Sequence, residues 1–255
     1  MFLIVILPLS NIFIQAFKDG PGPFLATMVD YNFLQAVKMT LICAGIAVPL
    51  NTVFGVMCAL YVARNEFPGK RAVIALLDLP FSISPVIVGL MLVLLYGRNG
   101  LYAPVLKFFG LQVVFALPGM VLATLFVTLP FVAKELIPLL EEADLSDEEA
   151  ARSLGANEFE VFWNVTLPNI RWGLLYGVVL ANARAMGEFG AVSVISGNII
   201  GRTQTLTLFV ESSYKEYATS AAFSAAVILC MLALVTLFFK NLLERKQAEK
   251  SEVKP

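Results

Sequence analysis

The sequence contains no histidine, only three cysteines, and few charged residues for its length of 255. Histidine is the commonest protein ligand of transition metals, so its absence argues against a zinc or haem centre. The cysteines lie inside apolar runs, where we expect them to pack as small hydrophobic side chains. The sequence also lacks a GxxxxGK[ST] phosphate-binding loop and any nucleophile–base arrangement. We therefore expect that the chain itself binds no metal or cofactor and is not an enzyme.

Apolar residues make up 58% of the chain and charged residues 15%, with a mean hydropathy of +0.80. A soluble domain is about half apolar and about a quarter charged, so this composition predicts a polytopic membrane protein embedded in a lipid bilayer. The formal net charge of −1 gives no basic excess that would indicate a nucleic-acid partner. We expect one all-α membrane domain over residues 1–245 and a short tail at residues 246–255.

Long apolar runs predict about six membrane-spanning helices, because a helix needs about 20 mostly apolar residues to cross a bilayer. The predicted spans are residues 1–17, 34–63, 72–96, 118–138, 172–196 and 220–240. The first run follows no basic region and has no clear small-residue cleavage site. We therefore expect it to be an uncleaved span and not a signal peptide.

The distribution of lysine and arginine predicts which loops face the cytoplasm. Eleven of the eighteen basic residues fall on one side of the predicted spans, and six fall on the other. The eleven are Arg64, Lys70, Arg71, Lys134, Arg152, Arg171, Lys240, Arg245, Lys246, Lys250 and Lys254. This bias places residues 139–171 and the tail in the cytoplasm, and an even number of spans places the N-terminus there as well.

The most polar part of the chain is residues 141–171, named here the acidic segment. Eight of the nineteen carboxylates lie in its first two-thirds, a density that lipid-embedded helices do not tolerate. In its second half Phe159, Phe162 and Trp163 fall on one helical face, and Pro168 is expected to end the unit. The simplest alternative is a solvated acidic loop whose helix signals are fortuitous.

The local pattern in the acidic segment predicts two short helices joined by a turn. Ser146 and Glu149 have the spacing of a capping box, and Asn157 and Glu160 repeat it. Gly155 stands between the two boxes, where a helix is expected to stop.

The acidic segment contains EAA, then three residues, a glycine, nine residues and VTLP. Its key positions are Glu149, Ala150, Ala151, Gly155, Leu167 and Pro168. This spacing resembles the EAA loop of the permease subunits of ABC importers, with valine where the family has isoleucine. The resemblance implies a type I importer permease fold, in which residues 139–171 form a coupling loop docked on a dimer of cytosolic ATPase subunits. The missing phosphate-binding loop agrees with ATP being used by a separate chain.

Three further stretches, residues 78–86, 96–100 and 183–198, resemble permeases for sulfate and thiosulfate. The last contains GEFGAVSVISGNI, which is similar to the W-type subunit rather than to its T-type partner. The resemblance implies import across the bacterial inner membrane, with a T-type permease and an extracytoplasmic sulfate-binding protein as partners. Molybdate and tungstate permeases share several of these elements, so they remain an alternative. Some molybdate relatives carry a cytosolic regulatory domain, and we expect none here.

Arg184 and Glu188 lie four positions apart within a predicted span and therefore on one helical face. One interpretation is an internal ion pair that fixes helix packing. The other places Arg184 near an anion pathway, with Glu188 limiting how tightly a dianion is held. For Asp78, a third intramembrane charge, we expect a packing or gating role, because a carboxylate repels sulfate.

Proline and glycine predict breaks in two of the spans. Pro80 and Pro85 favour a kink, while Gly187 and Gly190 permit a broken helix or close helix contacts. Hydroxyl side chains near these positions are further pathway candidates, and ordinary small-residue packing explains them equally well. They are Ser82, Ser84, Ser193 and Ser196.

Two other classes of membrane protein are left open. An ion-coupled secondary transporter would show inverted repeats, and its transport would survive ATP depletion. A membrane enzyme would need a catalytic constellation, which Asp78, Arg184 and Glu188 do not complete. The sequence leaves open which oxyanion is carried and whether identical or different permeases pair.

Overall fold

The computed structural model describes the backbone of residues 2–252 and the side chains of residues 6–236 and 238–242. Every regular element in that part is helical, which confirms the predicted all-α fold. The elements are α1 (Phe2–Ala16), α2 (Pro21–Val29), α3 (Tyr31–Arg64), α4 (Lys70–Ser82), α5 (Pro85–Tyr96), α6 (Ala103–Phe109), α7 (Leu117–Thr128), α8 (Pro130–Glu142), α9 (Ser146–Ser153), α10 (Glu158–Val161), the π-helix η1 (Phe162–Thr166), α11 (Leu167–Met186), α12 (Gly190–Ser196), α13 (Leu206–Lys215) and α14 (Thr219–Glu252).

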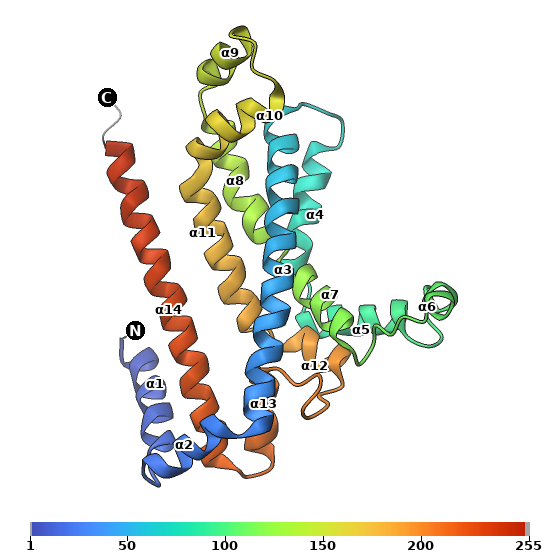
Figure 1. Ribbon diagram of the computed structural model, residues 1–255, viewed down its shortest axis with the longest axis vertical. Coiled ribbons are helices and arrows are strands. Elements are labelled where there is room, and N and C mark those ends of the chain that lie inside the picture. Colours follow the sequence, from blue (N-terminus) through green and yellow to red (C-terminus); the bar gives the residue numbers. More distant parts are fainter. Residues whose placement is uncertain (1, 253–255) are drawn as a thin grey trace.

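The longer helices lie roughly along the long axis of the molecule (Figure 1). α14 continues through the first residues of the predicted tail, and residues 253–255 of that tail lie outside the described part of the chain. The side chains of the basic residues in the tail also lie outside the described part. The prediction that they face the cytoplasm is therefore not tested by the structure.

Three helical stretches in the described residues are long and apolar enough to cross a membrane. They are Tyr31–Arg64, Leu117–Glu142 and Thr219–Leu242. Two bent pairs also qualify when each is taken as one span, which raises the number to five. They are Lys70–Ser82 with Pro85–Tyr96, and Glu158–Met186 with Gly190–Ser196. The first predicted span coincides with α1, whose side chains are described only from Ile6 to Ala16, so the total of six stays a prediction.

The predicted spans at residues 72–96 and 172–196 are broken helices. α4 and α5 meet at 105°, and the helix ending at Met186 meets α12 at 51°. Pro85 begins α5 and disfavours a helical backbone at the residue before it, and Ser84 accordingly has a ψ of 132°. The kink predicted from the prolines is therefore confirmed. The second break follows Gly187, which caps the end of α11.

The two breaks pack against each other. A Cβ atom on Gly190 would lie 2.9 Å from the Cβ of Pro85, and one on Gly89 would lie 2.6 Å from the carbonyl oxygen of Ala191. Glycine at these positions lets α5 and α12 approach closely. Apolar side chains from α5, α7 and α12 then form a buried cluster around Met120.

We expect the substitution Gly89→Ala to lower the free energy of unfolding by about 1–3 kcal/mol, as overpacking of a tight contact does. The matched control is Gly45→Ala in α3, because a Cβ there meets nothing within 4 Å. Alanine favours a helix over glycine, so the control should leave stability unchanged or raise it by up to about 1 kcal/mol. Unfolding in mixed detergent micelles measures both, and equal stability of the two variants would contradict the close α5–α12 contact.

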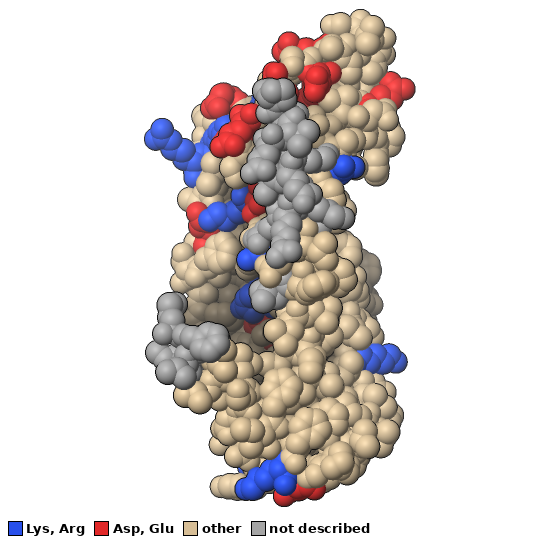
Figure 2. All heavy atoms as spheres, turned by 90° about the vertical axis from the view of Figure 1, so that its left-hand side faces the viewer, with Lys and Arg blue, Asp and Glu red and all other residues tan. Residues whose placement is uncertain are grey.

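The acidic segment projects from one end of the bundle, where α9 and α10 form its tip (Figure 1). Most of the acidic side chains visible on one face of the molecule lie toward this end (Figure 2). Below the tip, buried apolar residues join α3, α8 and α11, among them Val62, Leu136 and Ile170. The acidic segment therefore stands on a packed core that reaches into the bundle.

Candidate functional site

The tip of the acidic segment consists of α9, a glycine turn and α10. Gly155 has a φ of 92°, a left-handed conformation that glycine adopts without strain. Its amide donates to the carbonyl of Arg152 at 3.0 Å, and the amide of Ala156 donates to that of Ala151 at 3.1 Å. These bonds close the end of α9, and the predicted helix stop at Gly155 is confirmed.

The two predicted capping boxes have different outcomes. Asn157 and Glu160 form a complete box, with reciprocal bonds of 2.9 and 2.8 Å between side chain and backbone. The box predicted for Ser146 and Glu149 is wrong. The Asp144 carboxylate accepts bonds from the amide and hydroxyl of Ser146, so the serine becomes the first helical residue instead of the cap.

Pro168 was expected to end the unit, and that expectation is wrong. The chain passes from α10 through the π-helix into α11, and Pro168 lies in the first turn of α11. The turn before it is π-helical, with the Leu167 amide donating to the Phe162 carbonyl, and this altered spacing precedes a residue that has no amide hydrogen to donate. The continuous path joins the tip directly to a long helix of the bundle.

The predicted coupling residues lie mainly on the surface of the tip. Glu149, Ala150, Gly155 and Pro168 are exposed, whereas Ala151 and Leu167 are partly buried. Large apolar side chains around the turn are exposed as well. Leu154 is 90% exposed, Phe159 70% and Trp163 52%, and the last two rings are in contact. The tip thus presents exposed carboxylates, small residues and exposed apolar groups together, which suits contact with another protein.

The sequence pattern did not single out Glu148, although it is the one buried residue of α9. Its carboxylate meets the Arg64 guanidinium at 2.6 Å. The partners are 84 residues apart, so no local pattern could have paired them. The sequence offered one indication that one of the two carboxylates faces inward. Neighbouring residues of a helix point about 100° apart, so Glu148 and Glu149 cannot both face the same side.

Further ion pairs tie the tip and its base together. Arg152 donates to both oxygens of Glu158, at 2.8 and 3.1 Å, and this hydrogen bonding raises the pKa of the Arg152 guanidinium above its ordinary value. Lys70 lies 3.3 Å from Glu141. The loop before α4 and the acidic segment therefore lie on the same side of the bundle, as the distribution of basic residues predicts.

Deeper in the bundle, Arg184 and Glu188 form an ion pair at 2.6 Å. The Glu188 side chain is 1% exposed and also accepts a bond from the amide of Ala191 at 2.8 Å. Arg184 keeps 32% of its side chain exposed. The predicted internal pair is therefore present, it bridges the break between α11 and α12, and it leaves part of the guanidinium accessible.

The four candidate serines lie in different surroundings. Ser82 and Ser84 are exposed at the break between α4 and α5, which contacts the break before α12. Ser193 is half-buried and donates to the carbonyl of Gly190 at 2.8 Å. Ser196 is fully buried, and its hydroxyl accepts the amide of Asn198. The structure thus brings three of the serines to the region of the two breaks, and it uses the fourth to build a turn.

Asp78 pairs with Lys134, a contact between α4 and α8 that the sequence did not predict. The lysine also lies over the Phe81 ring, with its nitrogen 5.2 Å from the centroid. Both charged side chains are nearly half exposed. This arrangement agrees with the packing role expected for Asp78.

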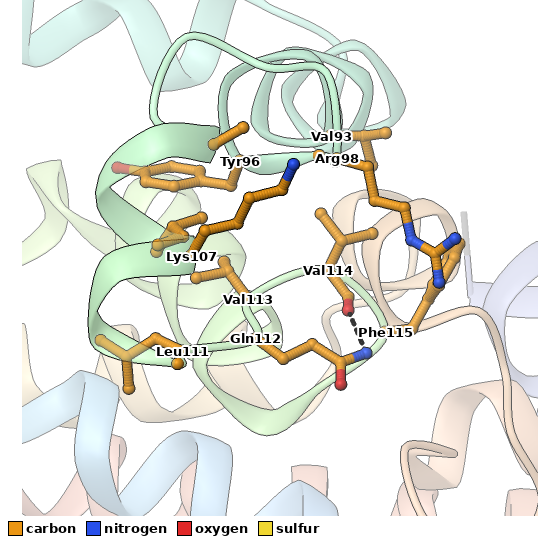
Figure 3. Close-up of a pocket in the computed structure, with 13 residues that line it drawn as sticks. Val93, Tyr96, Arg98, Lys107, Leu111, Gln112, Val113, Val114 and Phe115 are labelled. Carbon is orange, nitrogen blue, oxygen red and sulfur yellow. Dashed lines mark hydrogen bonds between the residues drawn. The ribbon is translucent and has the colours of Figure 1, made fainter.

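A hollow of about 540 Å³ lies between the end of α5, α6 and the loop before α7 (Figure 3). Two basic side chains, Arg98 and Lys107, line it together with Gln112 and mostly apolar residues. None of the pathway residues predicted from the sequence lines this hollow. The hollow and the two helix breaks are therefore separate features.

Comparison with known proteins agrees with these features. The family model described as binding-protein-dependent transport system inner membrane component matches residues 51–249. Sulfate permease 2, chloroplastic, of Chlamydomonas reinhardtii is 67% identical over 98% of this chain and 68% of its own length. The sulfate transport system permease protein CysW of Synechocystis is 56% identical over 96% of this chain and 89% of its own. A bacterial ABC transporter involved in the import of alginate shares the fold, with a TM-score of 0.79 at 20% identity over 96% and 91% of the two chains.

Proposed function

We propose that this chain, which belongs to the family of binding-protein-dependent transport system inner membrane components, is the W-type permease subunit of a sulfate importer. The observation that carries the proposal is the 56% identity to a CysW protein over nearly the whole chain. The sulfate permease of Chlamydomonas, at 67% identity, supports the same cargo. Both of these relatives are sulfate permeases, which favours sulfate over molybdate or tungstate, the alternative drawn from the sequence.

The chain itself carries out no bond chemistry, and we assign ATP hydrolysis to two separate cytosolic subunits. The exposed surface of Glu149, Ala150 and Gly155 is the contact for those subunits. α9 is short and stands at the end of the bundle, so closure of the ATPase pair would displace it. α11 follows the tip without interruption and carries that displacement toward the break at Gly187.

The two packed breaks are the region where the pathway would open and close. A change in the angle of either broken helix moves the other, because α5 and α12 meet through glycine contacts. The accessible part of Arg184, with Ser82, Ser84 and Ser193, would meet the anion there. Glu188 already neutralises Arg184, so a dianion would be attracted weakly and released readily, as a pathway requires.

The remaining partners follow from the proposed subunit type. They are a T-type permease, an extracytoplasmic sulfate-binding protein and the lipid of the inner membrane. The exposed apolar residues of α6 support a protein or lipid neighbour on that side, since Phe108 is 84% exposed and Phe109 65%. Selectivity would rest mainly with the binding protein, which meets the anion first.

Uptake of radiolabelled sulfate tests the proposed cargo. In cells that depend on this chain for their permease, we expect sulfate uptake to be suppressed by unlabelled thiosulfate, and to be at least tenfold less sensitive to unlabelled molybdate. The expected discrimination is between sulfur and molybdenum oxyanions, and cells lacking the chain are the control. Molybdate competing as well as sulfate itself would contradict the assignment.

A further inference from the structure

α9 is held to the bundle in an unusual way for a short surface helix. A surface helix ordinarily docks through an apolar stripe. The sequence of α9 is SDEEAARS, which offers no large apolar side chain. Glu148 is its one buried residue, at 6% exposure. Among the side chains of α9, the Glu148 carboxylate therefore makes the buried contact with the bundle.

Groups from two other elements converge on that carboxylate. The guanidinium of Arg64, the last residue of α3, lies 2.6 Å from Oε1 of Glu148. The hydroxyl of Thr166, the last residue of the π-helix before α11, donates to the same oxygen at 2.9 Å. Arg64 also donates to the carbonyl of Leu140 in α8 at 3.4 Å. The carboxylate thus links α9 to α3 and to the start of α11, and through Arg64 to α8.

The contacts on the other oxygen keep the carboxylate oriented. Arg152, one turn later in α9, lies 3.5 Å from Oε2 of Glu148 and also binds Glu158 at the start of α10. A buried carboxylate with a cation and a hydroxyl on one oxygen is held more strongly than an exposed pair, because water cannot replace its partners. α9 is therefore fixed in position and direction relative to α3 and α11.

The helices fixed in this way reach the pathway region. α3 runs the length of the bundle, and its Thr40 hydroxyl accepts the amide of Leu206 near the other end at 2.8 Å. α11 ends at the Arg184–Glu188 pair beside the second break. A displacement of α9 that is passed through Glu148 would therefore move both helices together.

We propose that Glu148 is a positioning residue that, with Arg64, transmits the displacement of α9 to α3 and α11. The inference rests on the proposed function and assigns different roles to two adjacent carboxylates. Glu149 faces outward to the ATPase, and Glu148 faces inward to the bundle. Without the Glu148–Arg64 contact, α9 can move with the ATPase while the bundle stays behind, and ATP is hydrolysed without transport.

The test uses the assembled transporter in proteoliposomes and measures anion uptake per ATP hydrolysed. The main variant is the double substitution Glu148→Leu with Arg64→Met, which removes both charges and leaves neither buried alone. We expect this variant to retain its ATPase subunits and its melting temperature within a few degrees, and to show uptake per ATP at least tenfold lower. The control is Glu66→Gln, which weakens the exposed Glu66–Lys70 pair outside α9 and α10 and should keep the wild-type ratio.

A second variant covers the case in which the double variant does not assemble. Glu148→Gln keeps the shape and the acceptor for Thr166 but removes the charge that meets Arg64, and we expect uptake per ATP to fall at least threefold. A wild-type ratio in either assembled variant would overturn the inference, since a purely structural contact would affect stability and not the ratio. Failure of the wild-type transporter to couple uptake to ATP would contradict the proposed function itself, and the inference with it.

Discussion

Replacing Glu149 by lysine is expected to reduce ATP-dependent uptake at least tenfold while the chain still inserts and folds. Glu149 is exposed on α9 and contributes no contact to the packed core. We propose that this carboxylate meets a basic group of the ATPase, and a lysine there would bring like charges together. A tenfold loss corresponds to about 1.4 kcal/mol, well within the cost of such a like-charge contact. Co-purification of the ATPase subunits and uptake of labelled sulfate measure the effect.

The matched control for this substitution is Asp147→Lys. Asp147 is exposed in the same first turn of α9 and undergoes the same change of charge, but it stands outside the EAA pattern. A cation at a helix start costs a few tenths of a kcal/mol, so a loss of less than twofold is expected. Equal losses in both variants would show that uptake depends on the net charge of α9 and not on the position of Glu149. Full uptake in the Glu149 variant would show that Glu149 is not part of the docking surface.

Replacing Arg184 by methionine is expected to lower the free energy of unfolding by roughly 3 kcal/mol. The substitution leaves Glu188, at 1% exposure, without its cation. Breaking a buried ion pair by removing one partner costs about 3–5 kcal/mol, and the lower figure applies because Arg184 is 32% exposed and solvent screens the pair. Unfolding in mixed detergent micelles measures the loss.

The control for the intramembrane pair is the double substitution Arg184→Met with Glu188→Gln. It removes both charges while the glutamine still accepts the amide of Ala191, so most of the stability should return, to within about 1 kcal/mol of the wild type. If the double variant is stable but transports sulfate at least fivefold more slowly, Arg184 acts on the anion as well as on packing. If it is stable and transports at the wild-type rate, the pair only fixes the break between α11 and α12.

Short-range signals in the sequence predicted part of the acidic segment correctly. The turn at Gly155 and the box of Asn157 with Glu160 depend on residues within one helical turn, and both are confirmed. The box at Ser146 is wrong because Asp144, two residues earlier, accepts the Ser146 amide, and the Glu149 amide donates to the Leu145 carbonyl. Pro168 is compatible both with the end of one helix and with the beginning of the next, so its position alone did not decide between them.

Contacts between residues far apart in the chain could not be predicted from the sequence. The burial of Glu148 depends on Arg64, which lies 84 residues earlier, so the pattern could not show which of two adjacent carboxylates faces inward. The kink at Pro85 was predictable from proline stereochemistry, but proline stereochemistry did not give its size of 105° or its contact with α12. The family, in contrast, was identified by the resemblance of the EAA stretch to known permeases, and the match over residues 51–249 confirms it.

The most direct test of the account is the energy source of transport. We predict that proteoliposomes containing the assembled transporter and its binding protein accumulate labelled sulfate when ATP is supplied to the ATPase side. Uptake should stop with a non-hydrolysable ATP analogue and should persist when ionophores collapse the proton and sodium gradients. Uptake that continues without ATP hydrolysis and stops when an ion gradient is collapsed would identify a secondary transporter and contradict the account.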